Sequence, residues 1–308
     1  MSTSIRTALL GLLLALATTA GALAQTPAKA PAKLHGFPTA EAAANALTDA
    51  IRKDDDKAVE AMLGGDWTDF VPGKVYDEDA VQEKFLKAWD EHHELQPQGD
   101  DKVLVQVGTT GWVSPIPIVK DGNEWRFDVE AGRKEVEART IGHNELSVIQ
   151  TLLAIVDAQR EYASMDPMKT GVPVYARRLV SSPGSKDGLY WESKPGEPES
   201  PLGPLLAKAQ PEDVKINGYY GYRFRLLYGQ GPDAPGGAHD YLINGRMRGG
   251  FAVIAYPVEY NKTGVMTFMV NQNGDVYEDD LGPDTGQEAA AITLFNPGEG
   301  WEKSDMTP

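Results

Sequence analysis

The residues with the clearest capacity for chemistry are His239 and Asp240, which follow a glycine-rich run at 236–238. A histidine beside an aspartate could act as a general base or a general acid. Neighbouring side chains on an extended chain point to opposite faces, however, and the chain holds no Gly-x-Ser-x-Gly motif that would supply a nucleophile. The pattern therefore favours a glycine turn followed by a strand. His239 and Asp240 are the acid and base only in the alternative that the protein is a hydrolase.

Three further groups of polar residues could bind a metal ion. His92 and His93 are adjacent on a predicted helix, where their side chains point about 100° apart and cannot clasp one ion as an i, i+4 pair does. The run 166–171 lacks the carboxylates that a calcium loop needs at its third and fifth positions. The glycine among residues 271–275 stands at the wrong offset for an EF-hand, so a hairpin turn is expected there. We predict no metal site and no cofactor.

Aromatic residues cluster at two places in the second half of the chain, one near residue 190 and one near residue 220. Exposed aromatic rings can bind sugars or peptides, and such a platform would explain both clusters. The alternative is that these rings pack at the edge of the core, as aromatic side chains in strands usually do. The predicted binding residues are Tyr190, Trp191, Tyr219, Tyr220, Tyr222 and His239.

The chain is acidic and contains no cysteine. Its 308 residues include 45 Asp and Glu against 29 Lys and Arg, which gives a formal charge of −16 and a pI near 4.7. Because the mean field repels polyanions, this balance argues against binding to nucleic acid or to anionic lipid surfaces, and no local basic patch is evident. The lack of cysteine excludes disulfides, thiol nucleophiles and thiolate metal sites.

Residues 1–24 have the pattern of a secretory signal peptide. Arg6 supplies the positive charge, residues 8–20 the apolar segment, and Ala22-Leu23-Ala24 the cleavage motif. The apolar run is shorter than the roughly 20 residues that span a bilayer, so no stable membrane anchor is expected after cleavage. Residues 25–36 are rich in Pro, Ala and Lys and predict a flexible leader. We expect an exported protein that is periplasmic or secreted.

Residues 37–138 predict an N-terminal α+β domain. Thr39 is a good N-cap for a first helix, and the hydrophobic period falls from about 3.6 to 2 beyond Pro97. Asp121-Gly122 predicts a hairpin turn between the last two strands. The helices are expected over 40–51, 57–63 and 79–93, and the strands over 103–107, 116–119 and 124–129.

Residues 139–308 predict a second α+β domain. An amphipathic helix is expected from Asn144 to about Tyr162, and a Pro- and Gly-rich irregular excursion at 181–211 is anchored by residues 189–191. Asn273-Gly274 predicts a two-residue hairpin turn. Strands are expected over 222–228, 251–258, 265–271 and 275–277, so one long helix packs across an antiparallel meander.

The element order of each half is similar to a known architecture. The N-terminal half, with helices before a sheet that ends in the strand 125–128, is similar to the cone-shaped folds of the nuclear-transport-factor-2-like (NTF2-like) superfamily. In that arrangement Trp89, Trp112 and Trp125 could line a pocket for a small apolar ligand. The C-terminal half is similar to the globular head of type IV pilin and pseudopilin-like proteins, although its helix is amphipathic and follows a whole other domain.

Several unusual strings resemble one bacterial family across nearly the whole chain beyond residue 37. They include Ser-Ser-Pro-Gly-Ser-Lys-Asp-Gly-Leu-Tyr-Trp at 181–191, Gly-Pro-Asp-Ala-Pro-Gly-Gly-Ala at 231–238 and the segment 264–285. These strings resemble the family called domain of unknown function 2950. The resemblance implies a secreted or periplasmic protein, and it carries no established activity and no catalytic residue.

The sequence thus predicts an exported, non-catalytic protein of the cell envelope that acts in binding or assembly. Its expected partner is an envelope protein or a glycan or peptide ligand, and not a nucleic acid. One alternative is a hydrolase of envelope glycans or peptides. A second alternative is a carrier of a small apolar ligand in the N-terminal domain.

Overall fold

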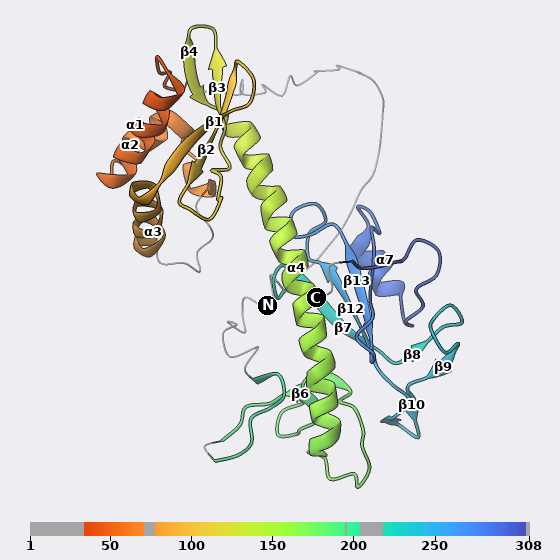
Figure 1. Cartoon of the computed structure of the whole chain (residues 1–308). Helices are drawn as coiled ribbons and strands as arrows, with labels where there is room; N and C mark the ends of the chain where they lie inside the picture. The colour runs from red at the N-terminus through yellow and green to blue at the C-terminus, as the bar shows by residue number, and fades with distance from the viewer. Residues whose placement is uncertain (1–33, 71–77, 195, 204–217, 306–308) are drawn as a thin grey trace, which may run out of the picture.

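The structure, a computed structural model, describes residues 34–70, 78–194, 196–203 and 218–305. These residues form an α+β fold in which two hydrophobic cores share one long helix, α4 (Val129–Met165) (Figure 1). The predicted signal peptide and residues 25–33 of the predicted leader lie outside the described residues. Across the described ranges, no helix combines the length and the apolar character needed to cross a membrane.

The N-terminal core consists of helices on one face of a four-stranded antiparallel sheet with the order β1-β2-β3-β4. Helix α1 contacts β3 and β4, and α3 contacts β1 and β2. Val103, Val105 and Val107 alternate along β2 and point into this core. The elements are α1 (Ala40–Arg52), α2 (Asp56–Leu63), the short 3₁₀-helix η1 (Trp67–Phe70), α3 (Glu78–Glu91), β1 (His93–Pro97), β2 (Lys102–Val107), β3 (Ile118–Asp121) and β4 (Glu124–Phe127).

Local capping signals position the first two helices as predicted. The Thr39 hydroxyl accepts a hydrogen bond from the backbone N–H of Ala42, and Asp55 caps α2 through the N–H of Ala58. Helix α2 ends at Gly64, whose φ of 89° is a conformation that glycine adopts without strain. Both boundaries are therefore set by residues within a turn of the helix ends.

The third helix and the strand after it differ from the prediction. Helix α3 ends at Glu91, and His93 already pairs with Val107 in strand β1. The prediction of a helix to His93, with strands only beyond Pro97, is wrong. Pairing with β2 decides the conformation of residues 93–97, because their own sequence has little β-propensity or apolar alternation.

The β3–β4 hairpin is confirmed, with its turn one residue further along than predicted. Asp121 pairs with Glu124, so Gly122 and Asn123 are the turn residues rather than Asp121 and Gly122. Gly122 has a φ of 64°, which fits the left-handed conformation that two-residue hairpin turns require. The strand ends at Phe127, and the chain enters α4 directly.

Helix α4 begins at Val129, well before the predicted start at Asn144. Asp128 caps it through the N–H of Ala131, and the helix is continuous across the predicted domain boundary at 138–139. The segment 134–146 is mostly exposed, so it lacks the apolar stripe that sequence patterning detects. The i, i+4 ion pairs Glu130–Lys134 and Glu135–Arg139 support it instead.

The C-terminal core is built on a five-stranded antiparallel sheet with the order β15-β14-β13-β12-β7, covered on both faces. Tyr222 and Arg225 point to opposite faces of β7: the Tyr222 hydroxyl lies 3.4 Å from Glu145 of α4, whereas Arg225 donates to the carbonyls of Ala289 and Ile292 at the end of α7. The elements are β7 (Tyr222–Leu227), β12 (Ala252–Pro257), β13 (Thr267–Asn271), β14 (Val276–Asp279), α7 (Thr285–Ala291) and β15 (Glu302–Lys303).

Short strand pairs extend from this sheet. The excursion after α4 is anchored as predicted, since Leu189 and Trp191 are buried in the C-terminal core. Of these strands of two or three residues, the sequence predicted only the start of one, at His239. The pairs are β5 (Arg178–Val180) with β6 (Gly188–Tyr190), β8 (Gly229–Gln230) with β9 (His239–Asp240), and β10 (Leu242–Ile243) with β11 (Arg246–Met247).

The connection between β13 and β14 is longer than the predicted two-residue turn. The last ladder pair is Val270 with Val276, and the predicted strand at 275–277 is shifted to Val276–Asp279. The buried Asn271 side chain accepts hydrogen bonds from the N–H groups of Asn273 and Asp275. This local side-chain bonding competes with the ladder and holds an open loop, with Gly274 at a φ of 90°.

Candidate binding surface

The loop that follows β8 is fixed by one buried glutamine. Gln230 is 3% exposed, and its amide donates to the carbonyls of Pro235 and Gly237 at 2.9 and 2.7 Å. Its carbonyl oxygen accepts from the Tyr241 hydroxyl at 2.9 Å. Burial raises the pKa of Tyr241 to about 12, so this hydroxyl stays protonated and remains a donor. The glycine-rich run is therefore a supported turn that leads into β9, as the sequence favours.

His239 and Asp240 lie side by side on β9, and both are exposed. The two ring nitrogens of His239 face the carbonyl oxygens of Gly237 and Gly249, at 3.2 and 3.3 Å. Because both ring nitrogens face backbone carbonyl oxygens, neither is directed at a substrate. No hydrogen bond joins the His239 ring to the Asp240 carboxylate, and the geometry of an acid/base pair is not present.

Beside this loop, β10 and β11 form a small hairpin that was not predicted from the sequence. Its turn is Asn244-Gly245, with φ values of 51° and 74°, and residues 243–246 are all exposed. Met247 is fully buried, so Arg246 and Arg248, its neighbours along the chain, point outward. Ile243 lies directly opposite Arg246 and is 47% exposed. The hairpin thus displays an aliphatic side chain beside the Arg246 side chain.

Two residues from other segments complete the surface. Tyr175 pairs with Met247 and brings the next strand alongside, so that the Arg177 guanidinium lies 3.4 Å from the carbonyl of Gly245. The Tyr228 hydroxyl donates to the Arg177 carbonyl at 3.0 Å, and the Tyr228 side chain is 43% exposed. We call this set of residues the hairpin surface: Arg177, Tyr228, Ile243, Arg246 and Arg248.

The hairpin surface corrects the view that the chain has no local basic patch. Arg177 is far in sequence from Arg246 and Arg248, so no run of basic residues reveals the three arginines together. Neither Arg246 nor Arg248 forms an ion pair with a described carboxylate. A signal did exist: Asn244-Gly245 between two short apolar segments is a strong hairpin motif, and the alternation Arg-Met-Arg at 246–248 predicts outward-facing charges.

The predicted aromatic residues divide between two sites. Trp191 is buried beside Tyr162, with the Lys186 ammonium 5.3 Å above its ring, and Tyr190 is half-buried next to it. The Trp191 indole N–H has no hydrogen-bond partner among the described residues. Burial, with the Asp187 and Asp166 charges, raises the pKa of Tyr162 to about 12, and its hydroxyl donates to the Lys186 carbonyl at 2.6 Å.

The second aromatic site contacts α4 about five helical turns away from the first. Tyr222 is fully buried, and burial, with the nearby Glu145, raises its pKa above the usual range. Tyr220 is 43% exposed, lies edge-on to Tyr219, and contacts His143 of α4. Since the positions 143 and 162 are about 28 Å apart along a helix, the five aromatic residues do not form one platform.

The polar groups considered for metal binding are engaged in local hydrogen bonds. The His93 ring stacks on Trp89 and bonds the Trp89 carbonyl at 3.0 Å. Asp166, at the end of α4, accepts from the N–H groups of Thr170 and Gly171, which lowers the pKa of its carboxyl. Among the described residues, no group of three or more His, Asp or Glu side chains is arranged to hold a metal ion.

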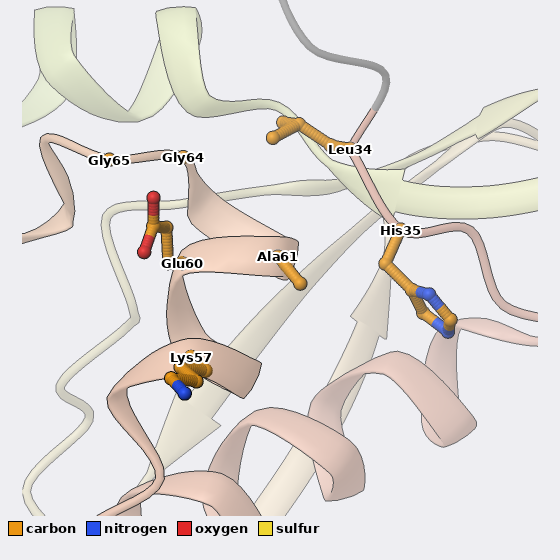
Figure 2. A pocket seen from close by; sticks show the side chains of 7 residues that line it. All are labelled: Leu34, His35, Lys57, Glu60, Ala61, Gly64 and Gly65. Carbon is orange, nitrogen blue, oxygen red and sulfur yellow. The ribbon is translucent and has the colours of Figure 1, made fainter.

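The three tryptophans of the predicted apolar pocket occupy separate places. Trp89 is buried against β1, Trp125 lies on β4 at the opposite edge of the sheet, and Trp112 is 45% exposed. A hollow of about 380 Å³ lies elsewhere, between the segment before α1 and α2, and Figure 2 shows the side chains that line it. Its lining is mixed and includes two charged side chains: Leu34, His35, Lys57, Glu60, Ala61, Gly64 and Gly65.

Fold and surface together define an α+β protein with two cores on one helix and a basic, partly apolar surface at one end. The family described as "Protein of unknown function (DUF2950)" matches residues 34–304, and the chain belongs to this family. No curated protein matches the chain. No solved structure matches it either, so the likenesses to NTF2-like folds and to pilin heads stay predictions.

Proposed function

We propose that the protein is an exported, non-catalytic component of the cell envelope that binds a partner through its hairpin surface. The pattern of residues 1–24 supports export. Arginine and tyrosine are enriched at the energetic centres of binding interfaces, and the hairpin surface combines both with an exposed isoleucine. The observation that carries the proposal is that three outward guanidinium groups meet exposed apolar side chains in a chain of net charge −16.

A non-catalytic role is favoured over hydrolysis by the environment of His239. Both of its ring nitrogens face carbonyl oxygens, and the Asp240 side chain is not its partner. His239 lies next to the hairpin through the Gly249 carbonyl, so in this proposal it helps to hold the surface in shape. The substitution His239→Ala is then expected to lower partner binding by a few-fold and to abolish no turnover.

In-cell photo-crosslinking tests the proposal. A photoreactive residue at Asn244, in the exposed hairpin turn, should yield one reproducible adduct in the envelope fraction. The matched control is the same residue at Glu161, an exposed position on α4. Adducts from position 161 alone, or the same adducts from both positions, would contradict a role for the hairpin surface.

The export part of the proposal has its own measurement. The protein should be recovered from the envelope or the medium with Gln25 as its first residue. An intact N-terminus on a cytoplasmic protein would overturn export while leaving the hairpin surface to be judged by crosslinking.

A further inference from the structure

We propose that the hairpin surface docks reversibly on an anionic phospholipid bilayer. The inference names the partner of the surface that the proposed function uses, and it rests on that function. It concerns peripheral binding by side chains at a bilayer surface, with the arginines contacting lipid phosphates and the apolar side chains entering the interface.

The first support is the chemistry of the charged groups. Arg177, Arg246 and Arg248 are all exposed, and an arginine guanidinium can bond a phosphate with two N–H groups at once. Each basic residue held near an anionic bilayer contributes about a fivefold gain in binding. Asp166 is bonded by its own loop, and neither Arg246 nor Arg248 forms an ion pair with a described carboxylate, so these guanidinium groups can bond a phosphate.

The second support is the exposed apolar surface around these arginines. Ile243 stands beside a two-residue turn in a hairpin whose tip is exposed on every residue, so it can enter a bilayer interface without any rearrangement of the core. Tyr228 is an amphipathic ring of the kind that settles at the headgroup level. A soluble anion would use the arginines and would leave these apolar side chains in water.

The third support is the position of the acidic part of the chain. Residues 34–70 and 78–128, at the first end of α4, carry 19 Asp and Glu against 8 Lys and Arg, whereas the described residues from 129 onward carry 23 against 15, so the larger excess of negative charge lies at the first end. The hairpin lies toward the other end, where Arg246 is close enough to Asp166 to help lower the pKa of its carboxyl (Figure 1). Helix α4 is about 55 Å long, and the Debye length is about 10 Å at 0.1 M salt. The larger share of the negative charge is therefore screened from a bilayer that the hairpin surface approaches.

Vesicle co-sedimentation tests the proposal, with residues 25–308 as the protein. Vesicles of phosphatidylcholine are compared with vesicles of equal parts phosphatidylcholine and phosphatidylglycerol. The protein should bind the anionic vesicles, and binding should weaken as salt is raised. The double variant Arg246→Glu, Arg248→Glu should bind at least tenfold more weakly, and Ile243→Ser several-fold more weakly.

Arg223→Glu is the matched control, because Arg223 is an exposed arginine at the other end of β7 with no ion pair to a described residue. It should bind like the wild type. Circular dichroism must give the same Tm for each variant, so that loss of binding is not loss of folding.

Four results would overturn the proposal: no binding to anionic vesicles, equal binding to neutral vesicles, equal loss in the Arg223→Glu control, or self-association through the same arginines without lipid. A protein adduct at position 244 together with absent vesicle binding would refute lipid docking and leave the proposed function standing. No adduct and no vesicle binding would refute both.

Discussion

The two cores of this protein differ in how completely their sheets are covered. In the C-terminal core α4 and α7 lie on opposite faces of the sheet, and Tyr222, Tyr241, Phe251, Phe268 and Phe295 are fully buried. In the N-terminal core helices cover one face, while Gln96 and Gln106 bond each other on the outer face of β1 and β2. Burial on two faces removes more apolar area from water. More buried apolar side chains therefore lie in the core that carries the hairpin surface than in the N-terminal core.

The strongest test of this difference is the same substitution in both cores. Phe268→Ala removes a fully buried ring between two layers and should lower the free energy of unfolding by about 3–5 kcal/mol. Phe85→Ala in α3 removes a half-buried ring and should cost clearly less. Urea unfolding followed by tryptophan fluorescence measures both. Equal losses would contradict the unequal covering of the two sheets.

One carboxylate bonds α4 to the segment that leads into β13. Glu145 accepts hydrogen bonds from the N–H groups of Val265 and Met266 at 2.8 and 3.0 Å. Glu145→Ala leaves two part-buried donors without this partner and should lower the free energy of unfolding by about 1–3 kcal/mol. Glu161→Ala, at an exposed position of the same helix, is the control and should change it by less than about 0.5 kcal/mol. Similar values for both variants would show that the contact contributes little.

Two glycines of α4 should respond to alanine with opposite signs. A Cβ at Gly142 meets nothing within 4 Å, so Gly142→Ala should stabilise the exposed segment by up to about 1 kcal/mol. A Cβ at Gly132 would lie 3.0 Å from Ile116 and 3.1 Å from Phe70, so Gly132→Ala should destabilise the N-terminal core. Thermal unfolding with helix content read by circular dichroism distinguishes the two. Destabilisation at both positions would mean that the segment near 142 is packed, and stabilisation at both would mean that the neighbours of Gly132 can move aside.

The smallest effect concerns the edge of the C-terminal sheet. The hydrogen bond from Lys303 on β15 lowers the pKa of the Asp275 carboxyl. Because the folded pKa is depressed, its stabilisation is present above the unfolded value of about 3.9 and is lost as the pH falls through the folded pKa. The difference in unfolding free energy between the wild type and Asp275→Asn should therefore shrink as the pH falls below about 4. A difference that does not change with pH would show that Asp275 does not stabilise the fold through its ionised carboxylate.

Features decided within one turn of chain are predictable from this sequence, and features decided by distant pairing are not. Thr39 and Gly64 mark helix ends through contacts with their own neighbours, so the helices α1 and α2 follow from the sequence. Strand β1 depends on its pairing with β2, and the first half of α4 packs on no apolar stripe, so neither has a clear local signal.

The candidate surface illustrates the same limit. His239 and Asp240 are adjacent in sequence and are therefore considered as an acid/base pair. In the structure the two ring nitrogens of His239 instead face backbone carbonyl oxygens. Arg177 and Arg246 are far apart in sequence and become neighbours only through the pairing of Tyr175 with Met247. The sequence identifies residues whose side chains could do chemistry, whereas the fold determines which of these side chains lie close together.

Because α4 is one continuous helix, its length sets both the distance and the rotation between the two cores. One extra residue inserted within 138–143 would turn the N-terminal core by about 100° about the helix axis and advance it by about 1.5 Å. Seven extra residues would advance it by about 10 Å and return it to within about 20° of its original direction. The number of residues between the two cores thus fixes their relative rotation about the helix axis. Binding of a partner that contacts both cores would depend on that number.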